Sequence, residues 1–367
     1  MVPNSRGLAP SRSPLLFALL AIVSACSSGG ATGSGGATGS GGATGSGGAT
    51  GSGGATGSGG ATGSGGATGS GGAGQTFHGP CSPTTRLGSF SVLLEEEVAG
   101  NPPYSKINGG IYDKPNVAEL WKQEGDKVGS CALWVGPDHT CSPACTSPQV
   151  CVGPNQCAAP AVLQSVGAGS ITGLGTMPIP LAPLGNKSYS ASLVDPYPPF
   201  ANGTAIQLTF PGGPGPAFEL NGEGFQPLTF EGKDLKSTRG EDFAFTWSPP
   251  TKTGPATIQA TMEIGHHGNV AARVECDFPD IGSAKIPASL VSALMDKGVH
   301  GYPQLVLSRR TVDSTQVTGG CVDLTVASDV LRILIACPTP GNCQTSCTNA
   351  ADCTPPQTCK ADYVCGS

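Results

Sequence analysis

The chain has few aromatic residues, few charges and no long apolar run, and each shortage argues against a class of protein. Aromatic side chains make up 5% and charged side chains 12% of the 367 residues. So few rings argue against an extensive aromatic platform for sugars. Arg309-Arg310 is the only adjacent basic pair, so the basic stripe that nucleic-acid binding requires is missing. The apolar run Leu15–Val23 is far shorter than the roughly 18 residues of a membrane-spanning helix.

Motifs for a named reaction are also missing. The region after the N-terminal repeats contains neither the HExxH zinc motif nor the G-x-S-x-G nucleophile elbow. His266-His267 is the strongest candidate for metal binding or acid–base chemistry. Adjacent side chains on a strand point to opposite faces, however, and Gly265 and Gly268 flank the pair. We therefore expect a solvated hairpin turn, with a metal site or catalysis as the alternatives.

Two further segments offer candidate ligand-binding groups. Asp277 and Asp280 flank Phe278-Pro279 and provide oxygen ligands for calcium, but the full D-x-D-x-D-G spacing is absent. A plain turn in which each aspartate bonds its own backbone is the preferred interpretation. The proline-rich segment Asp195–Phe200 is expected to be stiff and extended. It could form a contact surface for a partner protein or a saccharide, but packing at the edge of the sandwich is the preferred interpretation. No cofactor is predicted.

The N-terminus predicts export and lipidation. Arg6 and Arg12 precede the apolar run, and the run leads into Val23-Ser24-Ala25-Cys26. This tetrapeptide resembles a bacterial lipobox, which implies removal of residues 1–25 as a signal peptide and acylation of Cys26, with palmitate as one of the acyl groups. Ser27 resembles the outer-membrane sorting pattern. We expect an outer-membrane lipid anchor that faces the periplasm or the cell surface.

The number of cysteines agrees with export and lipidation. The chain has 15 cysteines, and lipidation of Cys26 leaves an even number. In an oxidising compartment the remaining 14 are expected to form seven disulfides. Structural zinc is the alternative, but only two Cys-x3-Cys pairs approach zinc spacing and neither has a matching second pair.

Residues 26–74 are predicted to be a disordered tether. After Cys26, residues 29–70 are seven perfect copies of GGATGS, without a charge, a ring or a large apolar side chain. Such a stretch cannot bury enough surface to offset its ordering entropy. It is expected to act as a flexible spacer between the lipid and the folded region.

A small cysteine module occurs twice. Cys145–Cys157 and Cys353–Cys365 both read C-T-x-P-Q-x-C-x5-C, and Cys141 precedes the first copy as Cys343 precedes Cys347. Pieces without an apolar core need covalent links to fold. We expect one group of six in a first module and one group of six in a C-terminal module, with Cys276 and Cys321 left over; a bond between these two would close about 45 residues. The first group comprises Cys81, Cys131, Cys141, Cys145, Cys151 and Cys157; the second comprises Cys337, Cys343, Cys347, Cys353, Cys359 and Cys365. Pairing within the groups stays open.

The predicted fold class is mainly β, a β-sandwich of Ig-like or similar type with one short helix. Residues 75–160 are expected to form a small β domain with the first module, 161–336 the sandwich, and 337–367 the C-terminal module. Alternating runs bounded by Gly, Pro or Asn support strands. They include Phe90–Leu94, Cys131–Val135, Ser188–Val194, Ala205–Phe210, Phe243–Trp247, Thr257–Ile264, Val270–Phe278, Gln304–Thr311 and Val330–Ile335. Pro287 as first helical residue and Gly298 after the last turn predict one helix.

The lipobox, the GGATGS tether, the repeated module and the segment Cys276–Leu290 (CDFPDIGSAKIPASL) together resemble uncharacterised surface lipoproteins of myxobacterial type. The resemblance covers most of the chain. It implies a lipid-anchored, β-rich protein and carries over no catalytic residue.

Two functional hypotheses remain. The first is a non-enzymatic, lipid-anchored envelope protein that presents the disulfide-bonded β-sandwich for binding, adhesion or structural use. Its partner would be an envelope glycan or protein. The alternative is a secreted or surface-anchored hydrolase with an unrecognised site in the β domain. A pocket with convergent polar groups of shifted pKa would favour the hydrolase.

Overall fold

The computed structural model describes residues 77–97, 102–117, 120–230, 232, 235–266, 269–298, 302–339, 342–344, 347, 351, 353, 355–360 and 365–366. Cys26 and the predicted signal peptide and tether lie outside these residues. The described chain is mainly β with a short helix, and together with its disulfides this confirms the predicted fold class. That helix is too short to cross a membrane.

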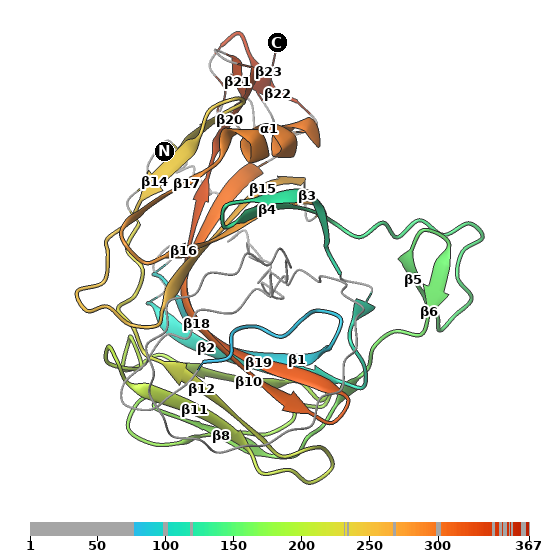
Figure 1. The fold of residues 1–367 in the computed structure, drawn as a ribbon, viewed down its shortest axis with the longest axis vertical. Helices are drawn as coiled ribbons and strands as arrows, with labels where there is room; N and C mark the ends of the chain where they lie inside the picture. The colour runs from blue at the N-terminus through green and yellow to red at the C-terminus, as the bar shows by residue number, and fades with distance from the viewer. Residues whose placement is uncertain are drawn as a thin grey trace, which may run out of the picture.

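A large, strongly curved sheet organises the molecule (Figure 1). Its order is β10-β2-β1-β19-β18-β15-β16-β4-β3, with β7 paired to the outer side of β2. All neighbours are antiparallel except β1 and β19, which are parallel. The strands are β1 (Arg86–Glu95), β2 (Tyr104–Tyr112), β3 (Lys122–Val128), β4 (Cys131–Val135), β7 (Leu163–Gln164), β10 (Tyr189–Leu193), β15 (Thr257–His266), β16 (Asn269–Pro279), β18 (Tyr302–Val317) and β19 (Gly320–Ile333).

Strands from both sides of residue 160 share this sheet. β1 and β2 insert between β19 and β10, and β4 pairs with β16, so that Cys131 lies opposite Cys276. The segments expected as two domains, 75–160 and 161–336, therefore contribute to one layer. Pairing between strands so distant in sequence leaves no local signal, because each strand shows only its own alternation.

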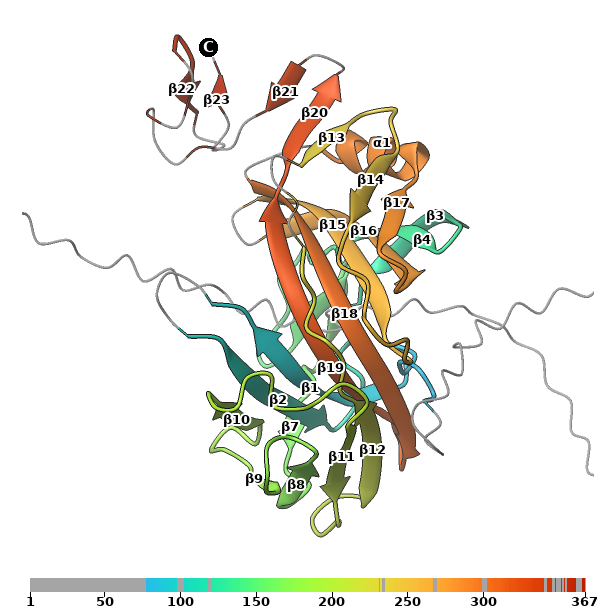
Figure 2. The same ribbon diagram turned by 90° about the vertical axis from the view of Figure 1, so that its left-hand side faces the viewer.

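A second sheet covers one half of the large sheet and completes a β-sandwich (Figure 2). Alternate side chains of β11 are buried, as the sequence Ala-Ile-Gln-Leu-Thr-Phe predicts. Phe210 packs against Phe90 and Tyr189 of the large sheet, with ring centres 5.1 and 5.0 Å apart. The second sheet has the order β12-β11-β8-β9 and comprises β8 (Gly169–Thr172), β9 (Ile179–Leu181), β11 (Ala205–Phe210) and β12 (Phe218–Glu223).

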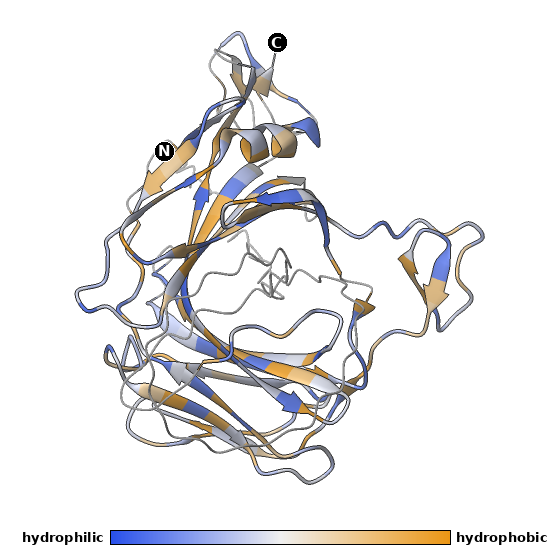
Figure 3. Ribbon diagram, viewed as in Figure 1, coloured by the Kyte–Doolittle hydropathy of each residue, from blue (hydrophilic) through white to orange (hydrophobic). Residues whose placement is uncertain are grey.

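The other half of the same face is covered by short elements and has its own apolar core. Leu290 and Leu294 of the helix pack with Phe243, Phe245 and residues of β15, β16 and β18. Buried apolar side chains thus gather on the covered face. Figure 3 shows hydrophobic residues, in orange, along β14, within α1 and in the strands of the large sheet. The covering elements are β13 (Lys236–Thr238), β14 (Phe243–Thr246), β17 (Ser283–Ile286), α1 (Ala288–Asp296), β20 (Ile335–Thr339) and β21 (Asn342–Gln344).

The predicted helix is confirmed with a shift of one residue at its start. Pro287 is the N-cap and has an extended backbone, so helical residues begin at Ala288. A carboxylate oxygen of Asp242 accepts a hydrogen bond from the backbone N–H of Ala288 and replaces the cap that proline cannot supply. Gly298 follows the last turn at φ 92°, a conformation that favours glycine.

All 14 described cysteines form seven disulfides, as parity predicts, but part of the predicted grouping was wrong. Cys81 bonds Cys321 and Cys131 bonds Cys276, so the large sheet holds two bridges. The two cysteines left over in the prediction, Cys276 and Cys321, each bond a member of the first group, and the first module contains four cysteines. The C-terminal group of six is confirmed. The remaining pairs are Cys141–Cys151, Cys145–Cys157, Cys337–Cys343, Cys347–Cys359 and Cys353–Cys365.

The two cysteine modules share one crossed pattern, in which the first cysteine bonds the third and the second bonds the fourth. Cys347, not Cys343, is the counterpart of Cys141, because Cys343 bonds Cys337 outside the module. Each module also pairs two short strands: β5 (Val150–Gly153) with β6 (Gln156–Ala158), and β22 (Thr358–Cys359) with β23 (Cys365–Gly366). The structure therefore supports a single module used twice.

Candidate functional site

A cleft of about 600 Å³ opens beside β18, at the boundary between the two halves of the molecule. Three phenylalanines and four prolines contribute to its lining, among them Phe77, Phe225 and Phe278. Ile281, in the turn after β16, also lines the cleft and is 70% exposed. The volume and the apolar lining are typical of ligand sites.

The cleft borders the edge of β18. Arg310, Thr311 and Val312 are consecutive residues of this strand, and all three line the cleft. Consecutive side chains of a strand point to opposite faces, so all three can border one space only along the strand's edge. β15 begins at Thr257, opposite Arg310, whereas β18 continues to Val317. The neighbouring strand thus stops where the cleft begins.

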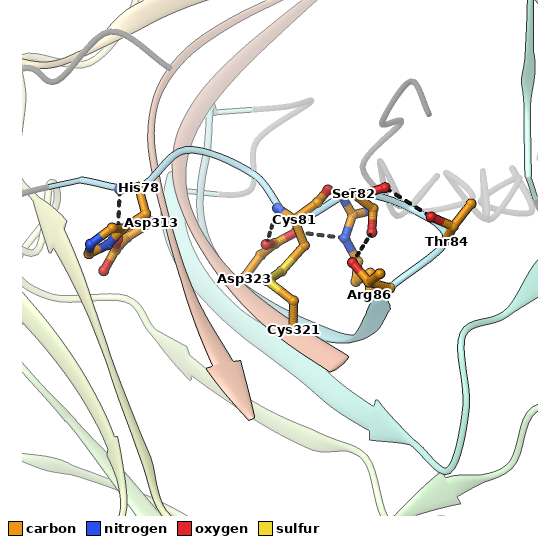
Figure 4. Close-up of a disulfide and its surroundings, with 9 residues drawn as sticks. His78, Cys81, Ser82, Thr84, Arg86, Asp313, Cys321 and Asp323 are labelled. Atoms are coloured by element: carbon orange, nitrogen blue, oxygen red, sulfur yellow. Dashed lines mark hydrogen bonds and ion pairs between the residues drawn. A yellow bond between two sulfur atoms is a disulfide. The ribbon is translucent and has the colours of Figure 1, made fainter. Parts of the chain in front are cut away.

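The segment Phe77–Cys81 forms the opposite wall and is fixed to both central strands (Figure 4). The backbone N–H of His78 donates to Asp313 of β18, and the backbone N–H of Cys81 donates to Asp323 of β19. Cys81 is also bonded to Cys321. Arg86 lies 2.6 Å from the Asp323 carboxylate; burial raises the pKa of that carboxyl, and Arg86 opposes the rise. This wall, here called the strap, is thereby held covalently and by ionic contacts.

Two ion pairs involve charged side chains of the cleft lining. Arg310 donates to Asp277 and to Gln259, and Asp277 is 61% exposed. Asp280 accepts hydrogen bonds from Arg309 and from the indole N–H of Trp247. Both predicted calcium candidates therefore bind arginine, and their hydrogen bonds to side chains replace the expected turn bonds to their own backbone. The candidates lie near the cleft as ion-pair partners.

Arg309 is fully buried between the two apolar cores. Its guanidinium donates two hydrogen bonds to Asp280 and three to the carbonyl oxygens of Gln226, Pro227 and Ser248. All five N–H donors of the side chain are thus satisfied. This one residue links β18 to three loops, all of which contribute residues to the cleft lining.

The opposite face of the large sheet contains a second polar group. Glu263 of β15 is buried and accepts a hydrogen bond from Gln304. Burial raises the pKa of Glu263, while the Gln304 bond and the Arg273 charge oppose the rise. Arg273 lies 2.6 Å from Glu275 and 3.9 Å from the ring centre of Trp121. Two carboxyl groups on one sheet face, one of them with a pKa raised by burial, form a pattern that also occurs in acid–base sites.

A third carboxyl on this face, Asp329 of β19, has a strongly shifted pKa. Desolvation raises the pKa of Asp329 to about 6, against the opposing hydrogen bond from Ser308, and Glu95 adds to the rise. Its Oδ1 atom is shielded from solvent and has no hydrogen-bond partner among the described residues. Ionisation of this side chain therefore opposes folding at neutral pH.

We expect Asp329→Asn to stabilise the fold at pH 7.5, by up to about 3 kcal/mol from a shift of this size. The raised pKa means that the folded state binds the proton more tightly than the unfolded chain. Wild-type stability from this group is present below the unfolded value near 3.8 and is lost as the pH rises through about 6. Urea unfolding at pH 4 and pH 7.5 should show the gain only at the higher pH. Asp126→Asn, at an exposed position, is the control. An equal gain in stability there would show that burial of Asp329 is not the cause.

The other predicted candidates that the structure describes do not line the cleft. His266 ends β15 and pairs with Asn269 across a hairpin, as expected from the flanking glycines, and His267 lies outside the described residues. Phe200 of the proline-rich segment packs against Phe225, in agreement with packing at the sandwich edge. Among the described residues, clusters with metal-ligand spacing contain cysteines that are already in disulfides.

The sequence contained one usable signal for this region. Leu305 and Leu307 occupy inward positions of β18, and alternation puts Arg309 at the next inward position. A charge there requires a partner. Comparison with known proteins adds no further residue: neither the protein-family models nor the curated proteins give a match to this chain.

Proposed function

We propose that this chain is a non-enzymatic, lipid-anchored envelope protein that holds a binding domain on a flexible tether. A disulfide-rich, mainly β fold is consistent with an extracellular structural or binding protein, and many disulfides indicate an extracellular or envelope location. The apolar cleft beside β18 is the observation that favours binding over a purely structural role. We include in this proposal that the protein is a surface lipoprotein of the myxobacterial type that its sequence resembles.

The order of the chain supports the display role. The repeats of the predicted tether end shortly before Phe77, which lines the cleft. A lipid on Cys26 would attach the protein to the outer membrane, and the tether would let the cleft reach a glycan or protein in the envelope. A spacer of this kind raises the local concentration of the domain near its partner.

We expect Cys26→Ser to release the protein from membranes, because the substitution removes the acylated thiol. Cells expressing wild-type or variant chain would be fractionated, and the membranes washed with high salt. The wild type should remain in the outer-membrane fraction, whereas the variant should appear in the soluble fraction with normal disulfides. Retention of a correctly cleaved variant after the wash would contradict the lipid anchor.

A hydrolase remains the second candidate because of Glu263 and Glu275. Both carboxyl groups lie on one sheet face and burial raises the pKa of Glu263, although Gln304 contacts Glu263 and Arg273 contacts Glu275. Incubation of the full chain with envelope polysaccharides separates the proposals. Bound but unchanged polysaccharide supports a binding protein; turnover that is lost in Glu263→Gln and kept in the exposed control Glu241→Gln supports the enzyme.

A further inference from the structure

The cleft exposes a strand edge without a neighbouring strand. β15 stops opposite Arg310, and the strap contacts β18 at Asp313. Thr311 and Val312 lie between these two points, and no described strand pairs with them on the side away from β19. Figure 2 shows the lower part of β18 extending past β15 and β16. The sheet therefore has a short gap in its pairing here.

This gap presents backbone hydrogen-bonding groups. In an antiparallel sheet, a residue directs both its N–H and its C=O toward one neighbouring strand, and the next residue directs both toward the other. One of Thr311 and Val312 therefore points both groups toward β19, and the other points both into the cleft. A free pair of this kind is the usual template for an added strand.

The surrounding side chains suit an uncharged segment. Rings of Phe77, Phe225 and Phe278 line the cleft, and Ile281 lies exposed in the turn beside it. Five charged side chains line the cleft, and three of them, Asp277, Asp280 and Arg310, are held in ion pairs with arginine or aspartate, so these three need no ligand charge. The other two are Glu223, which is buried, and Lys252. An apolar side chain fits such a lining better than a charged one. The binding partner is thus defined by an extended backbone and apolar side chains.

We propose that the cleft binds an extended, uncharged peptide segment of another protein, which adds to the edge of β18 in the place that β15 leaves open. The inserted segment bonds the free backbone groups at Thr311 or Val312 and places an apolar side chain among the phenylalanine rings. The inference rests on the proposed binding function and specifies its ligand class.

The test uses the full-length protein and a pool of immobilised octapeptides in which Val, Ile, Phe or Pro alternates with Thr. Wild type should bind members of the pool saturably. Ile281→Asp, which puts a charge beside the cleft at an exposed turn, should weaken binding at least about tenfold. Ile333→Asp is the matched control, since Ile333 is also exposed but lies on β19 outside the cleft lining.

A second readout separates strand addition from simple apolar contact. The best peptide would be N-methylated either at its even or at its odd backbone nitrogens. An added strand uses the N–H groups of alternate residues, so one series should lose binding and the other should keep it. Equal binding by both series, no binding by any octapeptide, or an unchanged affinity of Ile281→Asp would overturn the proposal.

These results also distinguish the two levels of inference. Envelope material that binds wild type and Ile281→Asp equally well, without any octapeptide binding, would preserve the binding function and overturn the strand-edge site. Failure of wild type to bind either octapeptides or envelope material would overturn both.

Discussion

Arg309→Ala is expected to destabilise the folded protein by about 3 to 5 kcal/mol, the range for removing one partner of a buried ion pair. The substitution leaves the Asp280 carboxylate buried with only the Trp247 indole as a partner. It also removes the donors for three loop carbonyls. Chemical unfolding of wild type and variant at pH 7 measures the loss. We expect the midpoint to fall sharply because Arg309 joins both cores.

The neighbouring arginine provides the matched control. Arg310→Ala removes hydrogen bonds to Gln259 and to an Asp277 side chain that is 61% exposed and stays hydrated, so we expect a smaller loss of about 1 to 2 kcal/mol. Replacing both members of the buried pair, as Arg309→Met with Asp280→Leu, should recover part of the stability, since no charge is left unpaired. Equal losses for Arg309→Ala and Arg310→Ala would show that burial does not set the cost.

Removal of the Cys81–Cys321 bond by two alanine substitutions is expected to lower stability by about 4 to 5 kcal/mol in the chain-entropy account. The two cysteines are 240 residues apart. The Cys131–Cys276 bond shortens the loop that they close to roughly 95 residues, which is still long enough for a large effect. Thermal unfolding should shift by on the order of 10 °C.

A disulfide outside the sandwich is the control for this experiment. Cys141 and Cys151 close a loop of only 10 residues in the module at the side of the molecule (Figure 1). Substitution of both by alanine should leave the main transition nearly unchanged, because neither residue packs in the large cores. A similar fall in both variants would mean that the two bonds stabilise one cooperative unit.

Local features of this fold are readable in the sequence, whereas its long-range contacts are not. Ala205–Phe210 and Cys131–Val135 match strands of the structure residue by residue, because alternation or short apolar runs mark them. No local pattern predicted that β1 would pair in parallel with β19. Cysteine parity predicted the number of bonds, but neighbours in sequence were a poor guide to pairs such as Cys81–Cys321.

The candidate site was harder to predict for the same reason. Its lining comes from the strap, from β18 and from loops around Phe225, Pro250 and Ile281. None of these segments carries a motif, and the cleft exists only where they meet. The inward position of Arg309 was the one local sign that polar contacts cross this region. The predicted candidates Asp277 and Asp280 proved to be near it, for reasons unrelated to calcium.

The strap has a mechanical consequence. A pull on the chain before Phe77 would meet the Asp313 contact and then a covalent bond at Cys81, which passes the load directly to β19. β19 is an inner strand, joined to β18 along almost its whole length and to β1 on its other side. The load therefore enters the middle of the sheet, where two ladders share it, and does not peel strands from the outer edges β10 or β3. A pulling force on the N-terminal side would therefore act on the strap first and on the apolar core of the sandwich last.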